Sequence, residues 1–264
     1  MMSGNEDVKY LIVPDVHGRD FWREPVNKTL QETDAKIIFL GDYVDPYYGE
    51  FYDGDEDEWL VEGINSWENL SDYVVKTLTD IIELKKQYPE RIILLLGNHD
   101  CSYAISTIIC NSRHERPKHA DILRKLFHEN RDLFQLAYED YINNTHYIFS
   151  HAGINKQYAY DCFGNKVNEN NVVKLFNKAY EEDSYGIMES LALFSHWRGG
   201  WRANYGSLVW ADAREFLLDN QEAYGLSVVG HTQLREPIIE DKFAFIDSRE
   251  CFTLNNDGKI EKYC

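Results

Sequence analysis

The chain has 264 residues, with 27 lysines and arginines against 45 aspartates and glutamates, a formal net charge of −18. Hydrophobic residues make up 44% and charged residues 27%, which excludes a largely disordered chain and predicts a single domain, residues 1–264, with a sizeable core. A general nucleic-acid binder needs a basic face, so that function is not expected either. A small anionic substrate stays compatible, because bound divalent cations can reverse the local charge.

The termini and cysteines indicate an intracellular protein. The N-terminus has no apolar core of signal-peptide type, and no run approaches the roughly 18 apolar residues of a membrane span. A disulfide framework or a thiolate zinc site is not expected, because the five cysteines are scattered without a C-x-x-C pair: Cys101, Cys110, Cys162, Cys251 and Cys264. We therefore expect a cytoplasmic protein with no membrane partner.

Three apolar runs predict buried strands that end in polar residues. Tyr10–Gly18 breaks into Asp-x-His, Lys36–Asp45 breaks into Gly-Asp, and Leu94–Asp100 ends in Gly-Asn-His-Asp. The stretch 19–34 predicts a helix, which gives a β-α-β opening with parallel strands and a right-handed crossover. The polar ends of these strands would then meet at one edge of the sheet.

An acidic, aromatic stretch at about 46–63 shows neither a helical nor a strand period. A lid or a calcium loop is one interpretation. The spacing of its aspartates and glutamates does not fit the D-x-[DN]-x-[DN]-G-x₅-E pattern, which favours a solvated insertion beside the site.

The middle of the chain predicts further helices and a fourth strand. Apolar residues at helical spacing predict a long helix over Asn65–Tyr88, followed by a strand, and two or three more helices over Tyr103–Tyr141. His146–Gly153 then predicts a strand that ends at His151. Three histidines of the helical region are expected at the surface rather than as ligands: His114, His119 and His128.

The last third predicts helices at 168–183 and 187–195, a loop, and then strands. The loop, about 195–214, is rich in tryptophan and arginine, which suits either a wall over an anion site or a packed corner. Mostly antiparallel strands follow, with a tight hairpin at Asp257-Gly258. The whole pattern predicts an α/β fold with two stacked sheets flanked by helices.

The residues at the predicted strand ends share oxygen or imidazole side chains: Asp15, His17, Asp42, Asn98, His99, His151 and His231. Such donors suit hard or borderline ions such as Mn²⁺, Fe²⁺, Zn²⁺ or Mg²⁺. One ion could not use all seven. Two ions that share a bridging carboxylate could, and such a pair polarises a phosphate ester and generates hydroxide for its hydrolysis.

Five motifs, in this order, resemble the calcineurin-like metallophosphoesterases, and within them the serine/threonine phosphoprotein phosphatase branch. They are DVHG at 15–18, GDYVD at 41–45, GNHD at 97–100, HAG at 151–153 and GHT at 230–232. The resemblance spans nearly the whole chain. It implies a four-layer α/β/β/α sandwich with two mixed β-sheets and a dinuclear site at the strand ends.

The resemblance also assigns roles to the residues. Asp15 and His17 would hold the first metal, Asp42 would bridge, and the second metal would be completed by Asn98, His151 and His231. His99 would be no ligand but the general acid, oriented by Asp45, a role that an imidazolium paired with a carboxylate can fill near neutral pH.

Two departures from the family pattern concern the substrate. His231 is followed by Thr232 and not by x-His, which favours the phosphoprotein phosphatase branch, whereas Pro46 stands where that branch has an arginine for the phosphate. Another guanidinium should replace it, with four candidates: Arg214, Arg198, Arg202 and Arg19. Asp100 is expected to be structural, and the Cys101 thiol buried and inert.

The sequence leaves three candidate functions. We expect hydrolysis of phosphomonoesters, with a phosphoprotein or a small phosphoester as the partner. The alternative is a phosphodiesterase or dinucleoside-polyphosphate hydrolase, which the missing arginine supports. An inactive scaffold that binds through Glu50–Glu58 is disfavoured, because buried carboxylates and imidazoles are costly without a cation.

Overall fold

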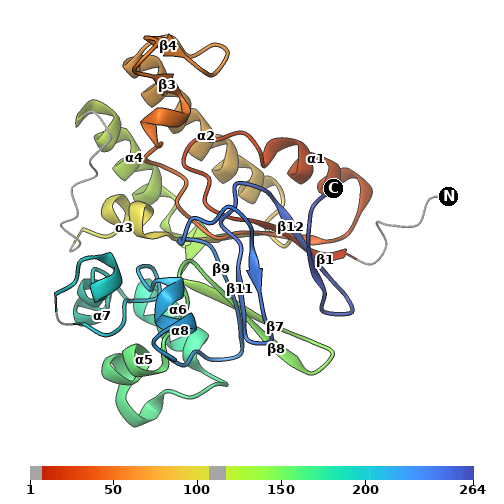
Figure 1. Ribbon diagram of the computed structural model, residues 1–264, viewed down its shortest axis with the longest axis vertical. Helices are drawn as coiled ribbons and strands as arrows, with labels where there is room; N and C mark the ends of the chain where they lie inside the picture. Colours follow the sequence, from red (N-terminus) through yellow and green to blue (C-terminus); the bar gives the residue numbers. More distant parts are fainter. Residues whose placement is uncertain (1–7, 107–116, 202) are drawn as a thin grey trace.

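The computed structural model describes residues 8–106, 117–201 and 203–264. Two mixed β-sheets form its centre, as expected (Figure 1). The strands of the first sheet are β1 (Val8–Val13), β2 (Lys36–Phe39), β5 (Ile92–Leu95), β6 (Phe134–Gln135), β12 (Phe252–Asn255) and β13 (Ile260–Lys262). Their order in the sheet is β13-β12-β1-β2-β5-β6, and β1, β2, β5 and β6 are parallel.

The second sheet has the order β10-β11-β9-β8-β7. Its strands are β7 (Ala137–Ile142), β8 (Thr145–Ser150), β9 (Leu226–Val229), β10 (Ile238–Ile239) and β11 (Phe243–Phe245). The expectation of mostly antiparallel late strands is wrong for this sheet, because β9 runs parallel to both β8 and β11.

Helices cover the outer faces of the two sheets and complete four layers. Figure 1 shows α1, α2 and α4 beside the first sheet and α5 to α8 beside the second. The helices are α1 (Arg23–Glu32), α2 (Trp67–Gln87), α3 (Asn98–Ala104), α4 (Pro117–Glu129), α5 (Lys156–Phe163), α6 (Val172–Glu181), α7 (Tyr185–Ser190) and α8 (Ala213–Leu217), with 3-10 turns at Tyr48–Glu50, Arg131–Leu133, Gly164–Lys166 and His196–Arg198. None of the helices in the described ranges is long and apolar enough to cross a membrane.

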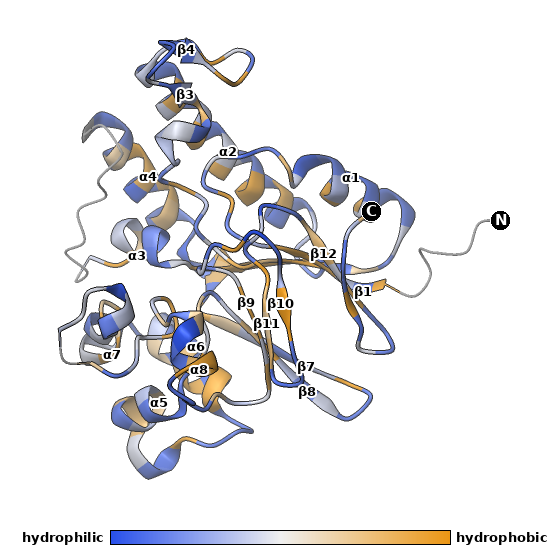
Figure 2. Cartoon of the chain, viewed as in Figure 1, coloured by the Kyte–Doolittle hydropathy of each residue, from blue (hydrophilic) through white to orange (hydrophobic). Residues whose placement is uncertain are grey.

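Alternation along the strands separates two apolar layers. Tyr10 and Ile12 of β1 pack between the sheets with residues such as Phe149, whereas Leu11 and Val13 face the helices. Figure 2 shows the strands as mainly hydrophobic and the outer surfaces of the helices as mainly hydrophilic. The sheets are therefore clamped on both faces, and their strand ends have little freedom to move.

The sequence prediction fails in the stretch before His146. Helices were expected as far as Tyr141, but β6 and β7 occupy residues 134–142. Asn143 and Asn144, with φ of 49° and 65°, form a two-residue turn between β7 and β8, and Ile142 pairs with Thr145. A two-residue turn of this hand matches the twist of an antiparallel pair, so pairing with β8 overrides the local apolar pattern.

His119 is a second correction, because its side chain is fully buried and not at the surface. Its Nε2 lies 2.9 Å from Oδ1 of Asp72, which joins α4 to α2. His128 is exposed, as expected, and His114 lies outside the described residues. The acidic stretch also contains a small hairpin, β3 (Tyr52–Asp53) with β4 (Glu58–Trp59), which was not expected and which projects from the body in Figure 1.

Two glycines let the ends of β2 and β5 meet. Gly41 has φ of +105°, and a Cβ at this position would collide with the backbone of Gly97. A Cβ at Gly97 would in turn collide with the backbone nitrogen and the carboxylate of Asp42. The close contact needs both glycines, and it sets the position of the Asp42 side chain.

We predict that Gly97→Ala lowers the free energy of unfolding by about 3 kcal/mol, because the added methyl group overpacks against Asp42. Gly186→Ala is the control: nothing lies within 4 Å of its Cβ position, so stability should stay equal or rise by up to about 1 kcal/mol. Urea unfolding followed by circular dichroism measures both. Equal stability of the two variants would contradict the close contact.

Candidate metal site

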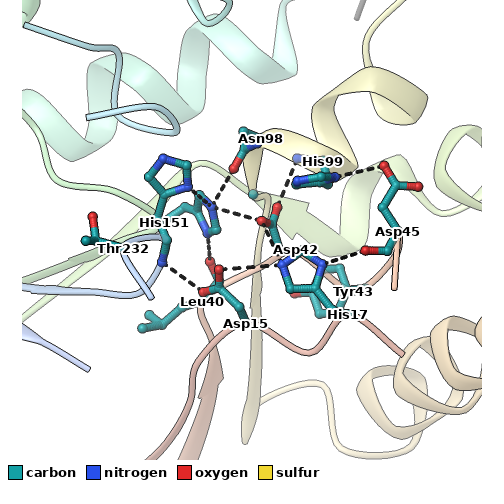
Figure 3. A network of polar contacts seen from close by, with 12 residues as sticks. Asp15, His17, Leu40, Asp42, Tyr43, Asp45, Asn98, His99, His151 and Thr232 are labelled. Carbon is teal, nitrogen blue, oxygen red and sulfur yellow. Dashed lines mark hydrogen bonds and ion pairs between the residues drawn. The ribbon is translucent and has the colours of Figure 1, made fainter. Parts of the chain in front are cut away.

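Strand ends from both sheets bring the expected ligands together (Figure 3). Asp15 and His17 follow β1, Asp42 follows β2, and Asn98 begins α3 after β5. The second sheet contributes the two residues that follow β8 and β9, His151 and His231. All six are at most 8% exposed.

Left-handed backbone conformations are concentrated at this site. His17, Asp42, Asp45 and His231 have φ of 45°, 50°, 59° and 61°. Each costs a non-glycine residue roughly 1 kcal/mol or more and persists only where the surroundings impose it. The turns that carry these side chains are therefore held by the fold, and they direct the side chains inward.

Asp42 lies at the centre of the cluster. Its Oδ2 is 3.4 Å from Nε2 of His17 and 3.4 Å from Nε2 of His151, while Oδ1 accepts the backbone N–H of His99 at 2.9 Å. Burial alone would raise the pKa of Asp42, but the imidazoles of His151 and His99 hold it well below its usual range. The side chain is thus an ionised carboxylate between two imidazoles.

The remaining donor atoms converge on either side of Asp42. Nε2 of His151 lies 2.9 Å from Oδ1 of Asn98 and 3.1 Å from Nδ1 of His231. On the other side, Oδ2 of Asp15 lies 3.9 Å from Nε2 of His17. Within the described residues, Asp42 belongs to two groups of possible metal ligands, one with His17 and His99 and one with His151 and His231.

Backbone carbonyls contact the Nδ1 atoms of His17 and His151 and fix the orientation of both rings. Nδ1 of His17 lies 2.9 Å from the carbonyl oxygen of Val44, and Nδ1 of His151 lies 2.9 Å from that of Leu40. When Nδ1 carries the proton in such a bond, Nε2 presents its lone pair. Both lone pairs then point toward Asp42.

This donor set fits divalent cations. Ligand atoms about 2.1 Å from an ion lie roughly 3 to 3.5 Å from each other, which matches the spacing around Asp42. Burying these carboxylates and imidazoles together has a high electrostatic cost, which a bound cation would offset. The oxygen and imidazole donors suit Mn, Fe, Zn or Mg and do not distinguish among them.

A seventh group that sequence reasoning missed is Asp247. Its carboxylate is buried, and within the described structure its Oδ1 has no hydrogen-bond partner. Burial and the negative charge of Asp15 raise the pKa of Asp247 to about 8. The signal was present in FAFIDS, because this strand also ends in an aspartate, but no family motif marks it.

His99 differs from the other histidines because its Nδ1 contacts a carboxylate. It lies 2.8 Å from Oδ2 of Asp45, whose Oδ1 accepts a hydrogen bond from the Tyr103 hydroxyl at 2.7 Å. Burial would lower the pKa of His99, but Asp42 and Asp45 raise it to about 9. Its side chain is 26% exposed, so Nε2 can reach a ligand from solvent.

Asp100 is structural, as expected. Its two oxygens accept backbone N–H groups from Asp42 at 2.6 Å, Gly97 at 2.9 Å and Tyr43 at 2.9 Å. This one side chain therefore holds together the turns after β2 and β5. Cys101 beside it is buried, as expected.

The candidate arginines have different surroundings. An Nη2 of Arg198 donates to the hydroxyl of Thr232 at 3.2 Å and lies 3.4 Å from the carbonyl of His231, next to the ligands. Arg214 is held by the carboxylate of Asp212 and lies over the ring of Trp197, with its side chain 46% exposed.

Arg19 is engaged by the acidic stretch. Its guanidinium makes a two-bond pair with Glu50, at 2.5 and 3.1 Å, and donates to the backbone carbonyl of Asp15 at 3.1 Å. Glu50 also pairs with Arg249 at 2.6 Å. The fourth candidate, Arg202, lies outside the described residues.

Two mixed sheets thus surround a buried set of oxygen and imidazole donors suited to divalent cations. The model of the calcineurin-like phosphoesterase family matches residues 8–234. The chain belongs to that family, whose members use divalent metals and act on phosphoesters. No curated protein sequence matches the chain.

Solved structures share the fold at low sequence identity. A cold-active protein-tyrosine phosphatase of a psychrophilic Shewanella species has a TM-score of 0.52 and 14% identity, over 97% of this chain and 80% of that one. A protein serine/threonine phosphatase from Saccharomyces cerevisiae, with similarity to human phosphatase PP5, has a TM-score of 0.49 and 14% identity, over 97% and 80%.

We predict that Asp100→Ala lowers the free energy of unfolding by at least about 3 kcal/mol, because it leaves three buried backbone N–H groups unpaired. Asp121→Ala, at an exposed aspartate of α4, should change stability by no more than about 0.5 kcal/mol. Urea unfolding measures both variants. A small effect of Asp100→Ala would show that this side chain does not hold the strand ends.

Proposed function

We propose that the protein is a metal-dependent phosphomonoesterase in which His99 is the general acid. The observation that carries the proposal is the His99–Asp45 pair, because Nδ1 of His99 contacts the Asp45 carboxylate while the ring lies beside His17 and Asp42. A proton donor next to two cation positions is what hydrolysis of a poor alkoxide leaving group requires.

The ligands would divide between two cations, with Asp42 common to both groups of donors. Asp15 and His17 would hold one, and Asn98, His151 and His231 would hold the other. When bound, the cations neutralise charge on the phosphoryl oxygens and lower the pKa of a water molecule. The outer-shell carbonyls of Val44 and Leu40 keep both Nε2 atoms available for this purpose.

His99 supplies the proton at Nε2. Its Nδ1–H donates to Asp45, and Asp45 is itself fixed by the Tyr103 hydroxyl, so the ring cannot rotate its Nε2 away from the site. The two carboxylates that raise its pKa keep the imidazolium form populated at neutral pH. The leaving oxygen takes this proton as its bond to phosphorus breaks.

Arg198 is the best-supported phosphate ligand. Its Nη2 contacts Thr232 and the backbone carbonyl of His231, beside the ligands, whereas Arg19 is paired with Glu50. Arg198 and Arg214 both pair with Asp212, but Arg214 lies over Trp197 with its side chain 46% exposed. Its Nε lies 2.7 Å from Oδ2 of Asp212, which fixes the position of the guanidinium. The terminal nitrogens of the planar guanidinium would then bind the phosphoryl oxygens.

A phosphodiesterase is the second candidate. Pro46 replaces an arginine of the phosphatase branch, which reduces the positive charge available for the dianion of a monoester. Comparing p-nitrophenyl phosphate with bis-p-nitrophenyl phosphate separates the two functions. A higher kcat/KM for the diester would replace the first proposal with the second.

We predict that His99→Asn lowers kcat for a phosphoserine peptide by about 10²- to 10⁴-fold, because the serine alkoxide needs a proton to leave. The loss with p-nitrophenyl phosphate should be about 10-fold or less, because p-nitrophenolate leaves without one. His128→Asn, at an exposed histidine, is the matched control. Equal losses for both substrates, or loss of bound metal, would show that His99 is not the acid.

We predict that Arg198→Met raises KM or lowers kcat/KM for p-nitrophenyl phosphate on the order of 10- to 100-fold, because hydrogen bonds to a charged group are lost. Arg214→Met tests the alternative arginine with the same change in shape and charge. Steady-state kinetics decide between them. A larger effect at Arg214 would move the phosphate ligand to α8.

A further inference from the structure

An exposed tyrosine stands at the entrance to the metal site. Tyr47 comes two residues after Asp45, and its ring centroid lies 4.7 Å from that of His17 in an edge-on arrangement. Burial of its hydroxyl and the nearby carboxylates of Asp42 and Asp15 raise the pKa of Tyr47 to about 12. Even so, 42% of the residue is exposed. Part of this side chain is thus accessible to a molecule that enters the site.

Tyr47 and His99 both contact the His17 imidazole. The His17 imidazole contacts the Tyr47 ring at 4.7 Å and the His99 ring at 5.0 Å. His99 is the residue assigned above to protonate the leaving oxygen. The leaving group would therefore lie beside His99, and Tyr47 is separated from His99 by one imidazole, that of His17.

A second aromatic residue flanks the opposite end of the ligand set. The Trp210 ring centroid lies 5.6 Å from that of His231 and 5.7 Å from that of Phe194, which is 37% exposed. His17 and His231 are proposed to bind different cations, so Tyr47 and Trp210 lie at opposite ends of the ligand set. Tyr47 directly follows Pro46, the position at which the phosphoprotein phosphatase branch has an arginine.

We propose that Tyr47 is a specificity-determining residue that makes this site prefer aryl phosphomonoesters, such as phosphotyrosine, over alkyl phosphomonoesters such as phosphoserine. This inference rests on the proposed phosphomonoesterase function. A phenyl ring bound to the phosphoryl oxygen reaches Tyr47 and gains ring-to-ring contact, whereas the short serine methylene gains little. Arg19, with its guanidinium 5.6 Å from the Tyr47 ring, supports that ring from another side.

The reaction is ordinary ester hydrolysis. The oxygen of a water molecule forms the new bond to phosphorus, the bond from phosphorus to the phenolic oxygen breaks, and that oxygen takes the proton of His99. One proton of the water is released to solvent. The products are a phenol and inorganic phosphate, so no further reactant is needed.

The test compares two peptides of identical sequence that carry phosphotyrosine or phosphoserine at one position. For the wild-type protein with Mn²⁺, kcat/KM should favour phosphotyrosine, and Tyr47→Ala should reduce this preference on the order of 10-fold. Tyr47→Phe should retain it. Tyr48→Ala is the matched control, because the Tyr48 ring packs on Trp67 at 4.8 Å and is similarly exposed.

A binding measurement tests the role of Tyr47 without depending on turnover. By calorimetry, the Mn²⁺-loaded protein should bind phenylphosphonate more tightly than methylphosphonate, and Tyr47→Ala should remove most of that difference. An unchanged preference in Tyr47→Ala, in kinetics and in binding, would overturn the role of Tyr47. Absence of turnover of either peptide, with binding that still depends on Tyr47, would instead refute the phosphomonoesterase function.

Discussion

The structure depends on one electrostatic constraint, which is that carboxylates and imidazoles converge on Asp42 in a buried space. Burying such a cluster is costly unless positive charge, such as that of bound cations, balances the carboxylates, and rigid turns must hold the side chains in place. The fold supplies the second condition in several ways: the back-to-back glycines Gly41 and Gly97, the three N–H bonds to Asp100, and four left-handed residues. The first condition makes metal binding part of the protein's stability as well as of its chemistry.

The same constraint distinguishes the proposed ligand histidines from the histidine proposed as the proton donor. The Nδ1 atoms of His17 and His151 contact neutral backbone carbonyls, so their Nε2 atoms are free to bind a cation. His99 contacts the carboxylate of Asp45 instead, which favours its charged form. The partner behind each ring therefore decides its role. A net charge of −18 does not exclude binding of a phosphate, because bound cations would reverse the local charge.

Much of this site could be predicted from sequence because its residues end buried strands, and an apolar run that stops at polar residues is visible without a structure. Several features could not. The strand β7 depends on pairing across the Asn143–Asn144 turn, and burial of His119 depends on Asp72 from a distant helix. The role of Tyr47 depends on its distance to His17, and the surroundings of Arg19 depend on Glu50 of the acidic stretch. These are contacts between segments, and local pattern does not encode them.

The most direct test of the central claim is anomalous diffraction from crystals grown with Mn²⁺. We expect two peaks roughly 3.5 to 4 Å apart with Asp42 between them, one beside Asp15 and His17 and the other beside His151 and His231. A single peak, or peaks that do not share Asp42, would contradict the account.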